Sequence, residues 1–386
     1  PTGGPATARR PWPAGGGAPV PEPLAFPARV AASDDGRLLA IADTGHDRVL
    51  VTTLDGLVLA AFTGYLQPSS VRFDHARLLV GDTVPGRVVW SDGEVLADGM
   101  ASPWDLVAAG DGSWIVAEAG GHRLVRLRPG QITTRVAAGN GNRGRVDGPD
   151  LRAELDHPSG LARDRDGVVF LDAGTGSLRR LASGRRGGEV TTLADGLHHP
   201  RAVAARPDVE VVCVADTLAS ALLVWDGGRL RRLEVDGLDE PGGLDLLPDG
   251  RLVVADTNHH RVVVVDPADS SVTPLVLDET WVHAADGDPV TVSAGGSGPV
   301  PVVLDLVDED LEPPAEVVVT ARPAGLLAGG AAQRFDLAGT TGVVTVRVGG
   351  PGRGLLLVQI TGRASGGGRR SERVQRRRHR LEVTPG

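Results

Sequence analysis

The chain has 386 residues, of which 41% are hydrophobic, and a formal net charge of −9 at pH 7. This length and composition are typical of a soluble globular protein with two domains, and they exclude a disordered or fibrous chain. The acidic balance argues against a general nucleic-acid-binding surface, because phosphate contacts need clustered cations.

Residue usage narrows the expectations further. The chain has no lysine, so all 40 Lys and Arg residues are arginines, which indicates a GC-rich genome. We expect a bacterial source. Cys213 is the one cysteine, so no intramolecular disulfide is possible, and we expect it to be a small buried hydrophobic residue. No stretch reaches the roughly 18 apolar residues of a membrane-spanning helix, and no signal peptide is visible. We therefore expect a cytoplasmic protein without a membrane partner.

The chain begins with a segment rich in proline and glycine, residues 1–26, which predicts a linker. Beyond it, one short phrase recurs about every 40 residues. Its clearest copies are residues 43–50 (DTGHDRVL) and 256–263 (DTNHHRVV), and each copy begins with an acid at the end of an apolar strand. The six acids are Asp43, Asp82, Glu118, Asp172, Asp216 and Asp256. This period is expected when each unit is one four-stranded blade, so residues 27–277 are predicted to form an all-β, six-bladed propeller.

The repeated acid has a structural interpretation and a functional one. At the end of a strand it can accept hydrogen bonds from main-chain N–H groups of the loop, or from an arginine five residues later. Arginine occupies that position in four copies, while Ser177 and Ala221 replace it in two. We favour the structural role; a set of metal-binding carboxylates is the alternative.

These copies resemble the NHL repeat, whose Asn-His-Leu phrase is approximated by residues 258–260. A second segment, residues 138–149 (AGNGNRGRVDGP) followed by residues 153–161, resembles the glycine-rich insert of thioredoxin–NHL proteins. The resemblance implies a thioredoxin-like domain, then a six-bladed propeller, then a small β domain. This chain matches the last two, and its beginning is similar to the linker that would follow the first.

After Leu277 the repeat stops. Residues 278–386 contain short apolar runs separated by glycine and proline turns, which predict a small C-terminal β-sandwich. In the resembled family this domain often ends in a hairpin with two cysteines; arginines stand there instead, which argues against a redox role. The arginine-rich run, residues 369–380, is interpreted as a solvated hairpin, and a contact for an acidic partner or nucleic acid is the alternative.

Loops on a rigid frame are the expected binding elements, here the signature turns and the glycine-rich insert. The candidate binding residues are His46, Arg48, Asn140, Asn142, Arg143, Asp147, His157, Asn258, His259 and Arg261. No catalytic residue, cofactor or resident metal is assigned. The adjacent histidines at 198–199 and 259–260 are poor chelates if each pair points to opposite sides of the chain.

Two functions are the main candidates, and nucleic-acid binding, as in NHL domains of some RNA-binding proteins, is a third that the net charge does not favour. The first is a non-catalytic scaffold that binds a protein or peptide, with a thioredoxin-like domain as one such partner and any thioredoxin-type activity outside this chain. The second is a metal-dependent hydrolase or lyase with its site in the central channel. For that site the candidate ligands are Asp74, Asp105, Asp164 and Asp245, with His75 and His157 nearby.

Overall fold

The computed structural model describes residues 23–277, except 76, 132–133, 183–187 and 209–210, and the β-strands between residues 285 and 385. Residues 1–22, most of the expected linker, lie outside the described residues. The chain divides into two compact units, one of which includes Pro23–Asp278 and the other Glu279–Gly386.

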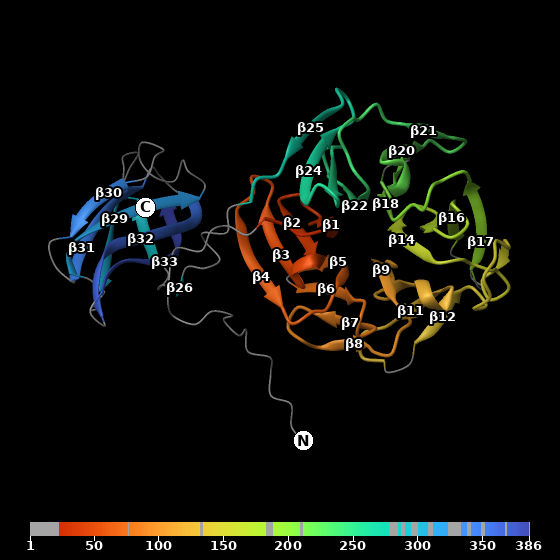
Figure 1. The fold of residues 1–386 in the computed structure, drawn as a ribbon, viewed down its shortest axis with the longest axis horizontal. Coiled ribbons are helices and arrows are strands. Elements are labelled where there is room, and N and C mark those ends of the chain that lie inside the picture. Colours follow the sequence, from red (N-terminus) through yellow and green to blue (C-terminus); the bar gives the residue numbers. More distant parts are fainter. Residues whose placement is uncertain are drawn as a thin grey trace, which may run out of the picture. The chain divides into compact units, whose positions relative to one another are not determined.

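The first unit is a ring of six antiparallel sheets in which the strands follow one another in chain order (Figure 1). Blades 1 and 2 comprise β1 (Pro27–Ala32), β2 (Leu38–Asp43), β3 (Arg48–Thr53), β4 (Val58–Thr63), β5 (Pro68–Asp74), β6 (Arg77–Asp82), β7 (Arg87–Trp90) and β8 (Val95–Ala97). Blade 3 comprises β9 (Pro103–Ala108), β10 (Trp114–Glu118), β11 (Arg123–Leu127) and β12 (Arg135–Ala138).

Blade 4 comprises β14 (Pro158–Arg163), β15 (Gly167–Asp172), β16 (Ser177–Ala182) and β17 (Glu189–Ala194). Blades 5 and 6 comprise β18 (Ala202–Ala205), β19 (Val212–Asp216), β20 (Ala221–Trp225), β21 (Leu230–Arg232), β22 (Pro241–Leu246), β23 (Leu252–Asp256), β24 (Arg261–Asp266) and β25 (Ser271–Pro274). The predicted six-bladed all-β propeller is thereby confirmed. The first strands of neighbouring blades contact one another all round the ring, including β22 with β1.

Alternation along each strand explains why the strands are almost continuously apolar. In β19, Cys213 and Ala215 pack towards blade 6, whereas Val212 and Val214 pack towards blade 4. Because successive side chains of a strand point to opposite faces, a blade between two others buries both. The buried clusters of the described residues accordingly join neighbouring blades in pairs.

The turns between the second and third strands have a common backbone form. In three blades this turn is a 3-10 helix: η1 (Thr44–His46), η2 (Ala119–Gly121) and η3 (Thr217–Ala219). Each is followed by a residue in the left-handed region. These turns and the prolines that begin most first strands lie at the same end of the blades, because adjacent strands are antiparallel. We call this end the signature face.

The ring closes between blades 6 and 1 without a shared strand, since blade 6 is formed entirely by residues 241–274. The Oγ1 of Thr257 donates a hydrogen bond to the carbonyl oxygen of Pro27, 2.8 Å away, and the main-chain N–H of Ala32 donates to Asp245, also at 2.8 Å. Side-chain and main-chain contacts of this kind therefore hold the first blade to the last.

The glycine-rich insert adds a fifth strand to blade 4. β13 (Gly148–Pro149) pairs with β17 at the outer edge of the sheet. Pairing satisfies main-chain groups that an open edge would leave free. The insert, which was expected to be a loop, is thus partly a strand of the blade.

The second unit consists of β26 (Ala285–Asp286), β27 (Val290–Ala294), β28 (Val300–Val307), β29 (Glu312–Arg322), β30 (Gln333–Leu337), β31 (Thr341–Val348), β32 (Gly352–Gly366) and β33 (Arg369–Pro385). β28 pairs with β31, and the other strands form one mixed sheet in which β32 and β33 make a long hairpin. The arginine-rich run is part of β33. The β-sandwich arrangement stays a prediction.

Candidate functional site

Each repeated acid ties its signature turn to the chain that enters the same blade. One carboxylate oxygen accepts the main-chain N–H of the residue two positions before the first strand's proline, at 2.5 to 2.8 Å in all six blades. The six donors are Ala25, Leu66, Ala101, Asp156, His198 and Asp239. Since these donors are main-chain groups, this hydrogen bond does not depend on the side chain of the donor residue.

The second carboxylate oxygen accepts an arginine in five blades. In blades 1, 2, 3 and 6 this is the arginine five residues later, as in the Arg48–Asp43 pair at 2.6 Å and the Arg261–Asp256 pair at 2.7 Å. The candidate residues His46 and His259 also contact these two acids, each with Nδ1 2.9 Å from the carboxylate. These four candidate binding residues are therefore held by the blade acids.

Blades 4 and 5 depart from this pattern. In blade 4, Arg179 replaces the missing arginine: its Nη1 lies 2.8 Å from Asp172, and both side chains are fully buried. In blade 5, Asp216 is contacted by the Nδ1 of His198 at 3.2 Å. Arg179 was not predicted as the partner, because the repeat places the arginine five residues after the acid, whereas Arg179 lies seven residues after Asp172.

A second set of bonds joins neighbouring blades on the signature face. The left-handed residue at the end of a signature turn uses its side chain to accept the main-chain N–H of the residue just before the next blade's proline. The pairs are Asp47 with Gln67 at 2.8 Å, His122 with His157 at 3.3 Å, Ser220 with Glu240 at 3.2 Å, and His260 with Phe26 at 3.1 Å. Both partners of every pair have positive φ angles. Gly86 and Gly176 hold the same turn position and have no side chain to offer.

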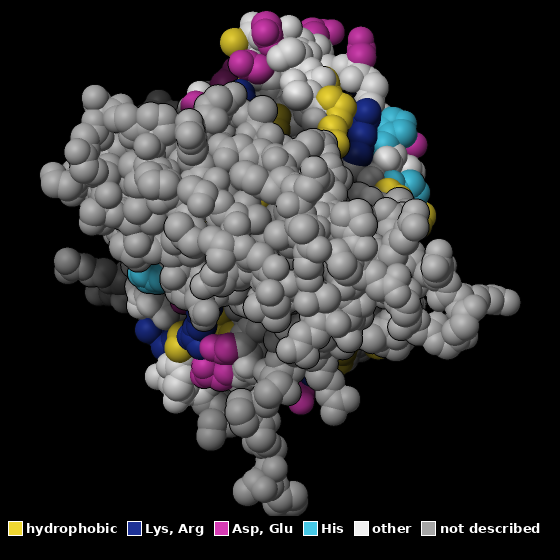
Figure 2. All heavy atoms as spheres, turned by 90° about the vertical axis from the view of Figure 1, so that its left-hand side faces the viewer, with side chains coloured by type: hydrophobic (Ala, Val, Ile, Leu, Met, Phe, Trp, Pro, Cys, Tyr) yellow, Lys and Arg dark blue, Asp and Glu magenta, His cyan; other side chains and the backbone are white. Residues whose placement is uncertain are grey.

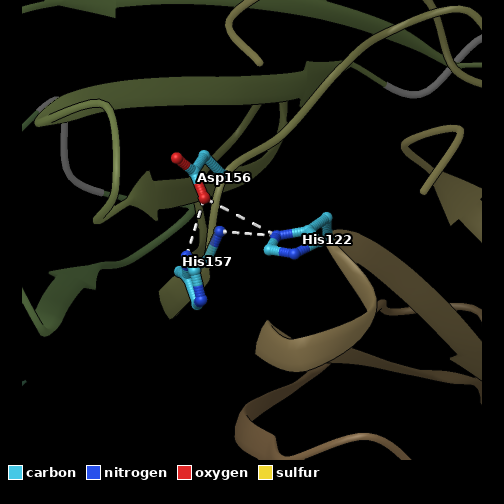
Figure 3. A group of neighbouring side chains, drawn as sticks. All are labelled: His122, Asp156 and His157. Carbon is cyan, nitrogen blue, oxygen red and sulfur yellow. Dashed lines mark hydrogen bonds and ion pairs between the residues drawn. The ribbon is translucent and has the colours of Figure 1, made fainter. Parts of the chain in front are cut away.

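The junction of blades 3 and 4 gathers His122, Asp156 and His157 (Figure 3). Asp156 Oδ1 lies 2.7 Å from His157 Nδ1 and 3.6 Å from His122 Nδ1, and the two imidazole rings meet edge to face with centroids 4.7 Å apart. The Arg143 guanidinium contacts both oxygens of Asp156, at 3.0 and 3.3 Å. The structure thereby brings together two candidate residues, Arg143 and His157, around an acid that sequence reasoning did not select.

Burial and the nearby positive charges disfavour protonation of His122 at this junction. Burial, together with the neighbouring His157 and Arg143, lowers the pKa of His122 below its ordinary value, although Asp156 acts in the other direction. Burial acts to raise the pKa of Asp156, but hydrogen bonds from Arg143 and His157 outweigh it and leave that pKa lowered. Asp156 is therefore ionised at neutral pH and His122 is neutral.

Two imidazoles and one carboxylate form a donor set that zinc accepts. Here, however, the Nδ1 of His122 accepts the His157 N–H, as Asp47, Ser220 and His260 do at other junctions. Arg143 also places a positive charge on the carboxylate that a cation would need. The arrangement of His122, Asp156 and His157 is therefore explained by the contacts that join blades 3 and 4.

The remaining insert residues contact their own loop and blade 4. Asn140 and Asn142 each direct an amide towards the Oε1 of Glu154, at 3.5 Å. Asp147 accepts Arg179 at 2.9 Å and the main-chain N–H of Thr192 at 2.8 Å. Asp147 is therefore a structural anchor of the insert. Asn258, the last candidate, donates its main-chain N–H to the Asp239 carbonyl oxygen at 3.3 Å.

An ion pair lies in the centre of the propeller, joining blades that are not neighbours. Arg29 of β1 and Asp105 of β9 are 2.6 Å apart and are 1% and 0% exposed. The same Asp105 oxygen accepts the main-chain N–H of Leu161 at 2.7 Å, and Arg72 Nη2 lies 3.5 Å from it.

The four carboxylates considered for a channel metal do not converge. Asp245 accepts the main-chain N–H groups of Ala32 and Leu246, whereas Asp105 pairs with Arg29. Asp74 pairs with the exposed His75, and Asp164 accepts Arg180 from its own blade. Both of these acids lie at the ends of the blades away from the signature face, because they border the turn between first and second strands.

Exposed apolar side chains also mark the signature face. Phe26 is 51% exposed, Leu66 46%, Val84 55% and Leu218 61%. Leu66 and Val84 are neighbours, since the N–H of Val84 reaches the Leu66 carbonyl oxygen. Figure 2 shows hydrophobic side chains beside arginine and histidine side chains on the coloured, described part of the surface.

Fold and turns together define a six-bladed β-propeller with NHL-type blades, and the profile of the NHL repeat family matches residues 238–265, which span the signature turn of blade 6. The chain is 26% identical over 358 residues to NHL repeat-containing protein 2 of Gallus gallus, covering 67% of this chain and 49% of the relative. It is 25% identical over 352 residues to the Homo sapiens protein of that name, covering 74% and 46%. The chain spans about half the length of the curated relatives it matches.

Solved structures match this chain at lower identity. A nidogen/laminin complex matches with a TM-score of 0.49 and 16% identity over 61% of this chain and 92% of that one. A virginiamycin B lyase from Staphylococcus aureus matches with a TM-score of 0.49 and 12% identity over 64% and 83%. The described residues include no helix long and apolar enough to cross a bilayer. A cytoplasmic location and a bacterial source stay predictions, and these curated relatives are vertebrate proteins.

Proposed function

We propose that the propeller is a non-catalytic scaffold that binds a protein or peptide partner on its signature face. The observation that carries this proposal is the set of exposed Phe26, Leu66, Val84 and Leu218 on turns held by buried acids. Exposed apolar groups on a rigid frame are typical of protein contact surfaces. A preorganised surface also loses little conformational entropy on binding.

The test compares matched substitutions on and off this face. Val84→Asp and Leu218→Asp introduce charges into the surface, whereas Val95→Asp changes an equally exposed residue at the outer edge of blade 2. We expect partners cross-linked to the wild-type chain in its source cell to be lost in the first two variants and retained in the third. Retention in all three variants would show that the partner binds elsewhere.

We also propose the domain order that the insert suggests: a linker over residues 1–26, the propeller over 27–277 and the β-sandwich over 278–386, preceded in the complete gene product by a thioredoxin-like domain. The resemblance of residues 138–149 supports this order, and the curated relatives are about twice as long as the matched region. The intact mass of the native protein tests it. We expect the native protein to be heavier than this chain by the mass of about 100–150 residues, a typical domain size. A mass equal to that of this chain would refute the proposed domain order.

A metal-dependent hydrolase or lyase in the channel is supported less well. Its best-placed carboxylate, Asp105, already pairs with Arg29, and a neighbouring guanidinium opposes a cation. Elemental analysis after incubation with zinc and calcium tests this alternative. Stoichiometric metal that disappears in Asp105→Asn would favour it over the scaffold.

A further inference from the structure

Trp104 and Arg201 meet although blade 4 separates their blades. Trp104 is the second residue of β9 in blade 3, and Arg201 directly precedes β18 in blade 5. The Arg201 guanidinium carbon lies 5.2 Å from the centre of the Trp104 ring, within the range of a cation–π contact. Each residue directly follows a proline at or just before the start of its inner strand, so the pair lies near the propeller axis on the signature face, at a place we call the channel mouth.

The Arg201 guanidinium has hydrogen-bonding capacity left over. Its Nε is buried and has no hydrogen-bond partner within the described part of the chain. Glu240 is the acid whose charge acts on it, and no ion pair between the two is present among the described residues. Burial lowers the pKa of Arg201, but arginine remains charged at neutral pH. A partly buried cation with free donors is costly unless a ligand satisfies it.

Buried arginines also lie along the axis, together with the carboxylates of Asp105 and Asp245, whose charges act on Arg29. Asp105 is shared by Arg29 and Arg72, and the Nε and Nη1 of Arg29 have no partner among the described residues although the side chain is 1% exposed. At the rim, burial and the charge of Arg201 lower the pKa of His199, so this imidazole is a neutral hydrogen-bonding group at pH 7. An anionic group at the mouth would therefore gain charge-assisted hydrogen bonds from Arg201.

We infer that the channel mouth binds a carboxylate group of the partner peptide, with Arg201 donating hydrogen bonds to the carboxylate and Trp104 contacting the adjoining apolar part. This inference rests on the proposed scaffold function and names the chemistry that the scaffold recognises. The planar fork of arginine suits a carboxylate, and the indole face holds the guanidinium in position. The exposed apolar residues around the mouth would contact the rest of the peptide.

Calorimetric titration at low ionic strength tests the inference on the full chain. The probes are an acetylated tetra-alanine with a free C-terminal carboxylate, an acetylated and amidated Ala-Ala-Ala-Glu, the neutral amidated tetra-alanine, and inorganic phosphate. We expect one or both carboxylate peptides to bind, and the neutral peptide not to bind. Comparison of the two carboxylate peptides distinguishes a chain terminus from an acidic side chain. Phosphate binding as tightly as the peptides would overturn the inference in favour of a small-anion site.

Two variants test whether Arg201 and Trp104 bind the peptide. Arg201→Gln should weaken peptide binding about tenfold or more, because a charge-assisted hydrogen bond is lost, and Trp104→Leu should weaken it less. Arg251→Gln is the control, since Arg251 pairs with Asp249 away from the signature face. Thermal unfolding of each variant verifies folding. Equal affinity in Arg201→Gln and wild type would refute the inference.

Different outcomes refute the carboxylate site and the scaffold surface, so the two proposals can be tested independently. Peptide binding that depends on Arg201, with native partners unaffected by Leu218→Asp, supports the carboxylate site and rejects the surface proposed for the scaffold. Partner loss in Leu218→Asp, with peptide affinity unchanged in Arg201→Gln, does the opposite.

Discussion

Arg179 donates a hydrogen bond to Asp172 across seven residues, with 2.8 Å between Nη1 and the carboxylate oxygen, and neither side chain is exposed. The same guanidinium donates to the carbonyl oxygens of Glu154 and Val146 and to Asp147. Arg179 thus supplies the arginine partner of the blade 4 acid and also holds the glycine-rich insert against blade 4.

Substituting Arg179 by Gln should destabilise the propeller by about 3–5 kcal/mol, because a buried carboxylate is left without its cation. Arg128→Gln is the control, because Arg128 pairs with Asp111 at the surface, where the two side chains are 42% and 49% exposed; its cost should be about 1 kcal/mol or less. Urea unfolding of both variants measures the difference. Equal losses would mean that Arg179 is no more important than a surface pair.

Stability should fall between neutral and mildly acidic pH in a manner that depends on His122. Its folded pKa lies below the ordinary 6.5, so its contribution is fully present above pH 6.5 and is lost as the pH falls through the lowered folded value. Protonation replaces the acceptor of the His157 N–H with a donor and adds charge near Arg143. Asp156 is the acid that faces this charge and reduces the effect.

His122→Asn isolates this effect, because asparagine keeps an acceptor and tolerates the left-handed backbone. Thermal unfolding from pH 7.5 to 5 should show a smaller decrease in the variant than in the wild type. Parallel curves would assign the pH dependence to another group, such as His199.

Gly56 should be intolerant of a side chain. Its φ is +89°, and a Cβ would lie 1.8 Å from the carbonyl oxygen of Val276, in the chain that leaves blade 6. Gly64 has a similar φ of +95° but no atom within 4 Å of its Cβ position. Gly64→Ala should cost about 1–2 kcal/mol for the left-handed backbone alone, and Gly56→Ala clearly more. Denaturant midpoints compare the two, and similar values would show that the contact is easily displaced.

Cys213 should be unreactive in the folded protein. It is 3% exposed, and burial raises the pKa of its thiol to about 12, so almost no thiolate forms at neutral pH. Labelling with a thiol reagent such as DTNB should be negligible without denaturant and complete after unfolding. Rapid labelling of the native protein would indicate that blades 5 and 6 separate readily.

The repeated phrases were sufficient to predict the propeller, because every copy encodes the same local unit: an apolar strand, an acid and a tight turn. The apolar strands also predicted Cys213 in the core, since a blade packed on both faces buries every residue of such a strand. Residues 43–50 and 256–263 carry this unit most clearly, and the structure places them in adjacent blades 1 and 6.

The tertiary structure alone decided which side chains meet between blades. Asp156 joins His122 across 34 positions, and Arg201 reaches Trp104 past an intervening blade. Asp105 likewise pairs with Arg29, which removes it from the set of channel carboxylates. The repeat specifies bonds within a blade, where spacing along the chain sets the distance. Contacts across the ring depend on how six twisted sheets close around one axis, and no local spacing encodes that geometry.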